Sequence, residues 1–317
     1  DFGFVVPDDG KIFHDVFVPK SQSKGAQEGE KVVVKINRWP AKRRNPEGEI
    51  IENLGHKTEA GVDIETIIKK LELPADFPSD VKEEVAAIPE KISDKEISRR
   101  KDLRDVKMVT IDGEDAKDFD DAVSIERLNE DQARVGVHIA DVTHYVKEGN
   151  PLDQEALERG TSIYLVDRVI PMLPEKLSNN LCSLRSEQDR LAMSVLMKFD
   201  LNSGEVLEHE ITESVINVNQ RLTYNQVKKM LVDEDEELID KFSHLISELR
   251  LMADLSKKVR ELRQDKGSVD FEFPEAEVVL DEEGNAIDIE KVDRTIAEKL
   301  IEDFMIKKNE VVAEEKY

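Results

Sequence analysis

The chain has 317 residues, of which 39% are hydrophobic and 37% charged, and its formal net charge is −25. This length allows two domains at roughly 150 residues per domain, and the charge argues against a broad basic face for nucleic acid. The longest apolar runs are only a few residues, so we expect no membrane-spanning segment, and Asp1–Val5 does not resemble a signal peptide. The single cysteine, Cys182, excludes an intramolecular disulfide and indicates a reducing compartment, which we expect to be the cytoplasm.

Residues 1–55 predict a small β-barrel. Three runs rich in Val, Ile and Phe (FGFVV, HDVFVP and KVVVKINRW) are separated by Asp/Gly and Ser/Gly clusters, which fits a barrel of OB type without its first strand. Phe2, Phe4 and Phe13 either offer stacking faces for bases or form the barrel core, and we favour the core. A basic cluster around Trp39 is either a phosphate contact or a solvated loop; it comprises Lys35, Arg38, Lys42, Arg43 and Arg44.

Residues 56–105 are expected to connect this barrel to a larger domain. The segment from Glu59 to Lys95 is acidic and helical in composition and predicts one or two helices. A second basic patch, SRRKDLR, follows at Ser98–Arg104. The larger domain, residues 106–317, alternates helical stretches with strand-like runs, namely MVTI, AVSIERL, RVGVHIADV, LAMSVLMKFD and VINVN.

Several helix and turn signals stand out in the larger domain. Asn150 before Pro151 predicts a helix start, and Thr223 with Gln226 predicts a capping box. Further helices and a hairpin are expected at Glu236–Arg263, at Thr295–Glu314 and around the turn Glu282–Asn285. The pattern as a whole predicts an α+β domain.

The stretch TIDGEDAKDFDDAV carries six carboxylates in the ten residues from Asp112 to Asp121, opposed only by Lys117. Its apolar flanks, MVTI and AVSI, predict that it is a loop anchored between two strands. Carboxylates crowded this closely resist ionisation together unless a cation neutralises them, and Mg²⁺ prefers oxygen ligands. We favour a metal site over a solvated acidic loop. A calcium loop of the EF-hand type is disfavoured, because Lys117 occupies the position where that loop needs glycine.

Other candidate motifs are weaker. Interpreted as a strand, HIADVTH places His138 and His144 on one side and Asp141 on the other, and we favour structural roles for them over zinc binding. Cys182 has no basic neighbour that would mark a nucleophile, so we expect a buried thiol. The sequence contains no GxSxG, P-loop or GxGxxG motif.

Four segments together resemble the catalytic domain of the ribonuclease II/ribonuclease R family: TIDGEDAKDFDDAV, GVHIADVTHYV, TSIYLVDRVIPMLPEKLSNNLCSL and DRLAMSV. The run PMLPEKLSNNLCSL and the Phe-rich start favour the bacterial ribonuclease R branch. The implied fold is α+β, with an OB-type, cold-shock-like barrel followed by the N-terminal part of a mixed α/β RNB catalytic domain.

This resemblance implies a processive 3′→5′ exoribonuclease that hydrolyses single-stranded RNA to nucleoside 5′-monophosphates by a two-metal mechanism with Mg²⁺, or with Mn²⁺ in its place. The family's four motif aspartates, which hold the metal and are catalytic, match Asp112, Asp118, Asp120 and Asp121. Its RNA-binding residues match Tyr164 in TSIYLVD and Phe271 in GSVDFEFPE, which would stack on bases, and Glu302 in IEDFM, which would contact a ribose.

Family members continue beyond the position of Tyr317 with an arginine that contacts the scissile phosphate and with a C-terminal RNA-binding barrel. We therefore expect this chain to be a fragment with little activity alone, and the helix at Thr295–Glu314 to expose apolar surface. The competing hypothesis is a non-catalytic RNA-binding or scaffold module with a degenerate catalytic fold.

Overall fold

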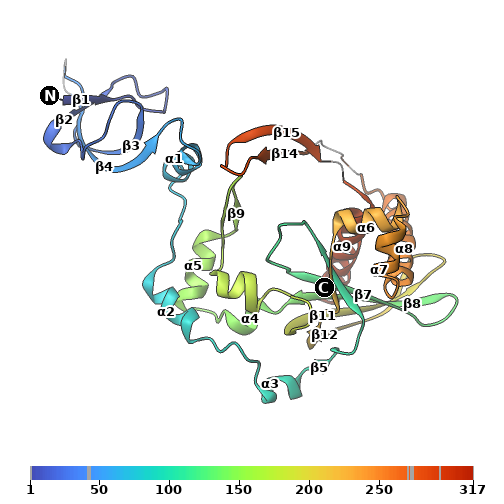
Figure 1. Cartoon of the computed structure of the whole chain (residues 1–317). Helices are drawn as coiled ribbons and strands as arrows, with labels where there is room; N and C mark the ends of the chain where they lie inside the picture. The colour runs from blue at the N-terminus through green and yellow to red at the C-terminus, as the bar shows by residue number, and fades with distance from the viewer. Residues whose placement is uncertain (1, 41–43, 270, 272–274, 293, 317) are drawn as a thin grey trace. The chain divides into compact units, whose positions relative to one another are not determined.

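The computed structural model describes residues 2–40, 44–269, 271, 275–292 and 294–316. The chain divides into two compact units, each built from segments that are far apart in sequence (Figure 1). The first unit contains Asp1–Asp76, Ser162–Ile170 and Ala276–Lys291. The second contains Phe77–Thr161, Pro171–Glu275 and Val292–Tyr317. The limits of these two units do not coincide with the domain limits expected near residues 55 and 105. Those expected domain limits stay a prediction.

The barrel of the first unit is a four-stranded sheet with the order β1-β2-β4-β3. Its strands are β1 (Phe2–Val5), β2 (Val16–Pro19), β3 (Glu30–Arg38) and β4 (Glu47–His56). The first three correspond to the predicted runs, whereas β4 was missed because its sequence, EGEIIENLGH, is rich in Glu, Asn and Gly. Gly48 lets β4 approach β3, because a Cβ there would lie 2.6 Å from Val34 Cγ1 and 2.7 Å from the Lys35 carbonyl oxygen.

The barrel core consists of Val16, Val18 and Ile50, not of the phenylalanines. Phe2, Phe4 and Phe13 are 64%, 51% and 88% exposed, so our preference for a core role was wrong. The rings of Phe2 and Phe4 lie 5.4 Å and 5.8 Å from the ring of Phe17, which leaves an aromatic surface on β1 and β2.

The basic cluster after β3 is only partly described. Trp39 is 72% exposed. Lys35 and Arg38 lie within 4.0 Å and 3.6 Å of Glu49 and Glu47 on the neighbouring strand. Lys42 and Arg43 lie outside the described residues.

The rest of the first unit is small. It contains α1 (Val62–Lys70) and the short pair β9 (Ile163–Tyr164) and β10 (Val169–Ile170). The strands β14 (Glu275–Leu280) and β15 (Ala286–Val292) pair across the turn at Glu282–Asn285, so the predicted hairpin is confirmed. The first 3-10 turn, η1, spans Lys20–Gln22.

The second unit is organised around a seven-stranded sheet with the order β13-β6-β7-β8-β11-β12-β5. The strands are β5 (Lys101–Asp102), β6 (Met108–Asp112), β7 (Asp121–Arg127), β8 (Gln132–Ala140), β11 (Asp189–Asp200), β12 (Val206–Asn217) and β13 (Gln220–Thr223). The inner pairs are antiparallel, and the two edge strands, β13 and β5, pair in parallel with their neighbours. Each of the five predicted runs lies wholly or mostly on a strand of this sheet, which confirms an α+β domain.

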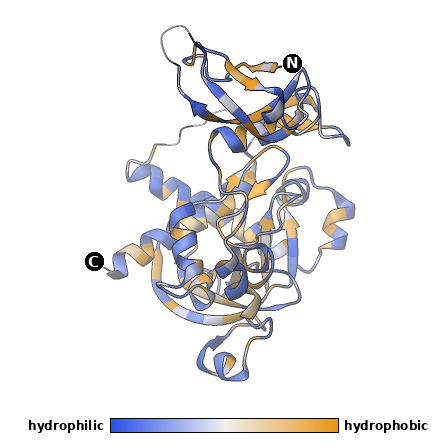
Figure 2. Ribbon diagram, turned by 90° about the vertical axis from the view of Figure 1, so that its left-hand side faces the viewer, coloured by the Kyte–Doolittle hydropathy of each residue, from blue (hydrophilic) through white to orange (hydrophobic). Residues whose placement is uncertain are grey.

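Helices cover both faces of this sheet. One face packs on α6 (Tyr224–Leu231), α7 (Glu236–Lys241), α8 (Ile246–Asp265) and α9 (Ile296–Lys316), which stand together in Figure 1. The other face packs on residues of α2 (Ser79–Ala87), α5 (Pro151–Arg159) and the π-helical turn η2 (Leu177–Leu181). The short helix α4 (Val142–Tyr145) also packs on this second face, through Val142 and Tyr145, and α3 (Asp94–Arg99) precedes β5. The helices are banded in blue and orange in Figure 2, as expected where one side of a helix is buried.

Most of the helix predictions are confirmed, with corrections. Asn150 precedes α5 as its N-cap residue, and Thr223 and Gln226 form the predicted capping box at the start of α6. The single stretch expected at Glu236–Arg263 is two helices, because the chain turns where Phe242 and Leu245 are buried. The segment Glu59–Lys95 contains α1 and α2 as predicted, and a third helix, α3, begins at Asp94 and also lies within the connector.

The helix α9 has packing partners within the second unit. Ala297, Leu300, Phe304 and Val311 are buried against α8, α6 and the sheet. The expectation that this helix exposes its apolar side was therefore wrong. Among the helices that the structure describes, none has the length and apolar character needed to cross a membrane.

The segment after β8 does not continue as a strand. β8 ends at Ala140, and Asp141 caps α4 by accepting a hydrogen bond from the backbone N–H of His144. The other oxygen of Asp141 accepts a hydrogen bond from the buried Arg100 guanidinium at 2.6 Å. The strand interpretation of HIADVTH was thus wrong beyond Ala140, and Asp141 has a structural role.

His138 belongs to a ladder of buried polar side chains across four adjacent strands. Its Nε2 lies 3.0 Å from Ser124 Oγ, and its Nδ1 lies 2.7 Å from Ser194 Oγ, which lies 2.6 Å from Ser214 Oγ. Burial lowers the pKa of His138 to about 4, so the imidazole is neutral at pH 7. This ladder satisfies buried polar groups and links the strands.

Gly136 makes room for this ladder. A Cβ at Gly136 would lie 2.6 Å from His138 Nε2 and still closer to Ser124 Oγ, and both side chains are buried and hydrogen-bonded. We expect Gly136→Ala to lower the free energy of unfolding by about 1–3 kcal/mol, the usual cost of overpacking. Urea unfolding measures this change. Gly113→Ala is the control, because its added methyl group would meet nothing within 4 Å. Equal stability of the two variants would contradict the prediction.

Candidate active site

The acidic loop connects two neighbouring strands in the sheet of the second unit. Asp112 is the last residue of β6, Asp121 is the first residue of β7, and these strands pair in antiparallel fashion. Asp118 and Asp120 lie on the loop between them. The prediction that the carboxylates are anchored between strands is therefore confirmed.

Backbone hydrogen bonds hold the second half of this loop. Ser183 Oγ accepts from the backbone N–H of Phe119 at 3.1 Å and donates to the carbonyl oxygen of Lys117 at 2.8 Å. Leu184 N–H donates to the Phe119 carbonyl oxygen at 2.8 Å, and Ala140 N–H donates to that of Asp120 at 2.9 Å. Asp118 and Asp120 thus flank a fixed, buried Phe119.

The site disfavours negative charge on several of its carboxyl groups at once. Asp112 is half-buried, and burial, followed by the charge of Asp121, raises its pKa to about 7, against the opposing effect of Arg221. Burial and the charge of Asp120 raise the pKa of Asp121 to about 6, although Lys308 lowers it. The pKa of Asp120 is also raised, by loss of hydration and by Asp118. Because the Asp120 side chain is exposed, Asp112 and Asp121 are the stronger evidence.

The donor atoms suit a hard divalent cation, which binds carboxylate oxygens. The Oδ2 atom of Asp112 is buried and has no hydrogen-bond partner among the described residues. Within the same described part of the chain, no three His, Cys, Asp or Glu side chains converge as a formed metal-binding group. The residues therefore fit a cation chemically, although their oxygens do not converge on one point in this structure.

The three expected RNA-binding residues lie apart from this loop in the sequence and on different elements. Tyr164 is on β9 in the first unit and is 67% exposed. Phe271 is 71% exposed and Glu302 is half-buried on α9, both in the second unit. The Glu302 carboxylate accepts a hydrogen bond from Arg294 Nη2 at 3.0 Å. The exposure of the two aromatic rings suits stacking, whereas their roles stay predictions.

Several residues beside the carboxylates were missed by the sequence analysis. Arg221 and Tyr224 come from the end of β13 and the start of α6, and Lys308 comes from α9. A cleft of about 210 Å³ lies next to Asp112; it is lined by Asp112, Gly113, Glu114, Tyr224, Asn225, Lys228, Thr295 and Glu298. The sequence RLTY, residues 221–224, did not indicate that Arg221 and Tyr224 lie near the carboxylates. Their position follows from the parallel pairing of β13 with β6.

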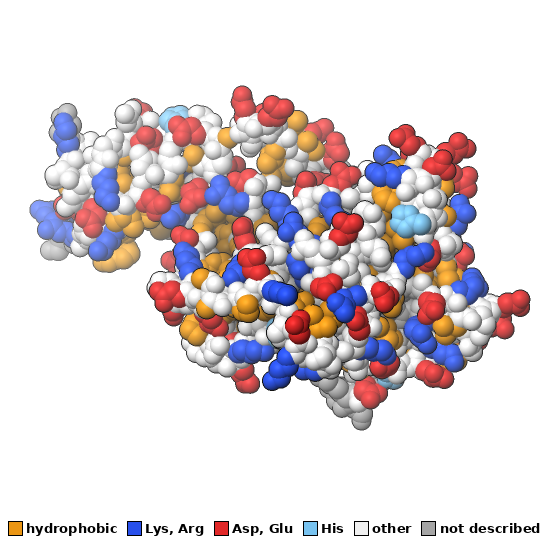
Figure 3. All heavy atoms as spheres, turned by 60° about the horizontal axis from the view of Figure 1, so that its bottom comes forward, with side chains coloured by type: hydrophobic (Ala, Val, Ile, Leu, Met, Phe, Trp, Pro, Cys, Tyr) orange, Lys and Arg blue, Asp and Glu red, His pale blue; other side chains and the backbone are white. Residues whose placement is uncertain are grey.

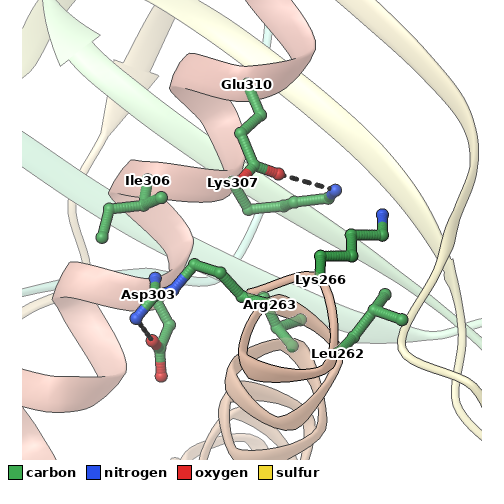
Figure 4. A pocket seen from close by; sticks show the side chains of 8 residues that line it. Leu262, Arg263, Lys266, Asp303, Ile306, Lys307 and Glu310 are labelled. Atoms are coloured by element: carbon green, nitrogen blue, oxygen red, sulfur yellow. Dashed lines mark hydrogen bonds and ion pairs between the residues drawn. The ribbon is translucent and has the colours of Figure 1, made fainter. Parts of the chain in front are cut away.

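A second, smaller pocket lies between α8 and α9 and has a structural character (Figure 4). The fully buried Asp303 accepts hydrogen bonds from Ser256 Oγ and Arg260 Nη2, each at 2.6 Å, and forms an ion pair with Arg263 at 3.3 Å. None of the four predicted metal ligands lines this pocket. The hydrogen bonds and ion pair of Asp303 hold α9 against α8. We therefore do not assign this pocket as the candidate active site.

The surface charge is mixed on the face drawn in Figure 3, where Lys and Arg side chains are interspersed with Asp and Glu. This agrees with the net charge of −25. On the described residues of that face, basic side chains do not form a continuous surface.

A small β-barrel and a sheet that carries clustered carboxylates define the class of the chain: a cold-shock-type domain followed by a nuclease-type catalytic domain. A family model described as "Cold shock domain" matches residues 4–78, and one described as "RNB domain" matches residues 100–316. The chain therefore belongs to the RNB family of exoribonucleases, the ribonuclease II/ribonuclease R family.

The curated relatives include ribonucleases R from several bacteria. The chain is 46% identical over 316 residues to "Ribonuclease R" of Thermotoga maritima, covering 99% of this chain and 44% of that protein. It is 39% identical over 307 residues to "Ribonuclease R" of Escherichia coli, covering 97% of this chain and 38% of that protein. The chain thus spans less than half the length of these relatives.

Solved structures give the same assignment. The structure described as Mycoplasma genitalium RNase R in complex with double-stranded RNA is 27% identical, with a TM-score of 0.86 over 98% of this chain and 56% of that chain. The yeast protein Ssd1, described as a pseudonuclease, is 18% identical, with a TM-score of 0.70 over 99% of this chain and 39% of that chain. The second likeness shows the fold alone.

Proposed function

We propose that this chain forms the cold-shock domain and the metal-site half of a processive 3′→5′ exoribonuclease that degrades single-stranded RNA to nucleoside 5′-monophosphates. The observation that carries the proposal is the pair of half-buried carboxyls, Asp112 and Asp121, whose pKa values are raised to about 7 and about 6 at the facing ends of neighbouring strands. A site that destabilises its own charges is suited to binding cations.

Asp112, Asp118, Asp120 and Asp121 would hold Mg²⁺ or Mn²⁺. When bound, a pair of such ions supplies Lewis-acid charge to the scissile phosphate and to the attacking water. Ser183, Leu184 and Ala140 keep the loop backbone in place, so the backbone needs little reorganisation when the substrate arrives. The buried Phe119 anchors the loop on its apolar side and helps to exclude water.

RNA is the substrate class that the relatives support. One Mycoplasma genitalium RNase R structure is described as a complex with ribose-methylated single-stranded RNA. In this chain the exposed rings of Tyr164 and Phe271 would stack on bases without sequence preference, and Glu302 would contact a ribose 2′-hydroxyl. The exposed rings of Phe2 and Phe4 offer further stacking surface on the barrel. We place the protein in the cytoplasm, since its single cysteine, Cys182, cannot form an intramolecular disulfide and fits a reducing compartment.

The competing proposal is a non-catalytic RNA-binding module. The likeness to the yeast pseudonuclease means that this fold alone does not decide activity. The carboxylates favour the enzyme, because clustered negative charge repels RNA and costs free energy when it is half-buried. A binding module gains nothing from such a site.

The test is a chimera in which residues 1–317 replace the matching segment of the Thermotoga maritima ribonuclease R, to which they are 46% identical. We expect the chimera to shorten a 5′-labelled single-stranded RNA from its 3′ end in the presence of Mg²⁺ and to release 5′-mononucleotides. A chimera that binds RNA and Mn²⁺ but leaves the RNA intact would favour the non-catalytic module.

Tyr164→Ala in the same chimera is expected to lengthen the smallest product while changing the rate on long RNA by less than about threefold, a loss below one stacking contact. A ring that stacks on a terminal base decides how short an RNA is still held for another cleavage. Product ladders on a sequencing gel measure this length. Val166→Ala, at another exposed position in the turn between β9 and β10, is the control, and an unchanged ladder for Tyr164→Ala would remove Tyr164 from the RNA site.

A further inference from the structure

Arg221 lies on the edge strand of the sheet, beside the strand that leads into the acidic loop. β13 pairs in parallel with β6, so that Arg221 is opposite Thr110 and Thr223 is opposite Asp112. The backbone of Thr223 is fixed further by the capping box at the start of α6. Strand pairing and the cap together hold Arg221 at a set position relative to the loop that follows Asp112.

The guanidinium of Arg221 contacts both ends of this loop. Its Nη2 donates hydrogen bonds to the carbonyl oxygens of Gly113 at 2.8 Å and Glu114 at 2.5 Å. Its Cζ lies 5.2 Å from the centre of the Phe119 ring, within the range of a cation–π contact. Among the described residues, its buried Nε has no hydrogen-bond partner, so the two carbonyls and the ring determine where the group lies.

We propose that Arg221 is a positioning residue, which holds the backbone of the acidic loop in the shape from which Asp112, Asp118, Asp120 and Asp121 bind divalent cations. This inference rests on the proposed function and deepens it. Six carboxylates in ten residues repel one another and favour an open loop. Arg221 opposes this opening with a positive charge, and it does so through backbone carbonyls, which leaves the carboxylate oxygens available for metal.

The experiment measures Mn²⁺ binding to the purified 317-residue chain by isothermal titration calorimetry, and loop opening by amide hydrogen exchange at residues 113–120. We expect Arg221→Met to raise the Mn²⁺ dissociation constant by at least about tenfold and to speed exchange in the loop. Arg221→Lys should fall between the parent and Arg221→Met, because an ammonium keeps the charge but lacks the planar group that lies over Phe119.

Two controls separate this inference from the proposed function and from general instability. Arg134→Met removes an arginine of the same sheet that pairs with Glu126 at 3.3 Å, and it should bind Mn²⁺ within twofold of the parent. Asp120→Asn should lose Mn²⁺ binding if the carboxylates form the site.

Loss of binding in Asp120→Asn with parental binding in Arg221→Met would overturn the positioning role and leave the site intact. Parental binding in Asp120→Asn would overturn the site itself. If Arg221→Met does not fold by circular dichroism, Arg221→Lys decides instead, and binding within twofold of the parent would count against the inference. Equal weakening by Arg134→Met would also overturn it.

Discussion

Asp120→Asn is expected to reduce RNA hydrolysis by the chimera at least about a thousandfold, since each factor of ten is about 1.4 kcal/mol of barrier and the change removes a charged metal ligand. The affinity for single-stranded RNA should stay within about threefold, because the stacking groups are untouched. Asp120 is an exposed residue on the loop, so the amide should be accommodated without a folding defect. Single-turnover cleavage at saturating Mg²⁺ and a filter-binding assay give the two quantities.

Asp115→Asn is the matched control for this prediction. Asp115 is an exposed carboxylate of the same loop, but it does not match one of the family's four motif aspartates. Its substitution removes the same charge and should leave the rate within about threefold of the parent. Cleavage by Asp120→Asn within about tenfold of the parent would sink the assignment, because loss of a metal ligand costs more than about 1.4 kcal/mol.

The metal-free chain is expected to lose stability as the pH rises from about 5 to 8, and divalent cations should reverse this loss. The pKa values of Asp112 and Asp121 are raised to about 7 and about 6 in the folded chain. A raised carboxyl pKa means that the folded state binds protons more tightly than the unfolded state. The associated stability is full below the unfolded pKa and disappears as the pH passes through the folded values.

Each unit of pKa shift is about 1.4 kcal/mol, so the two coupled, half-buried groups should change the free energy of unfolding by about 2–4 kcal/mol. Metal requires the ionised carboxylates, so stabilisation by Mn²⁺ should grow over the same pH window. Urea unfolding between pH 5 and pH 8, with EDTA or with Mn²⁺, measures both slopes. The variant Asp112→Asn/Asp121→Asn should flatten them, and parental slopes in this variant would show that other groups titrate.

The local features of the fold could be predicted because short-range physics governs them. The capping box at Thr223, the proline start of α5 and the hairpin at Glu282–Asn285 depend on residues within a few positions of one another. The strands on either side of the acidic loop follow from apolar, β-branched runs. β4 was missed because its sequence is rich in Glu, Asn and Gly, residues that are rare in strands. The predicted continuation of β8 beyond Ala140 was wrong because Asp141 caps a helix there.

The sequence also failed to predict which aromatic side chains are buried. Phenylalanine is often buried, which favoured a core role for Phe2, Phe4 and Phe13, yet Val16, Val18 and Ile50 fill this core. A barrel this small has room for few large side chains, and the strand register decides which of them face inward. No pattern in three short runs shows that register.

The sequence by itself determined the family, the acidic motif and its position between two strands, because a dense, ordered set of residues carries this information locally. Only the tertiary structure decided which carboxyls are half-buried and which basic side chain lies beside them. Arg221 reaches Gly113 and Glu114 because an edge strand more than a hundred residues away pairs with β6, and Ser183 reaches Phe119 from a different segment again. Such contacts arise from packing between distant parts of the chain, which local propensity does not encode.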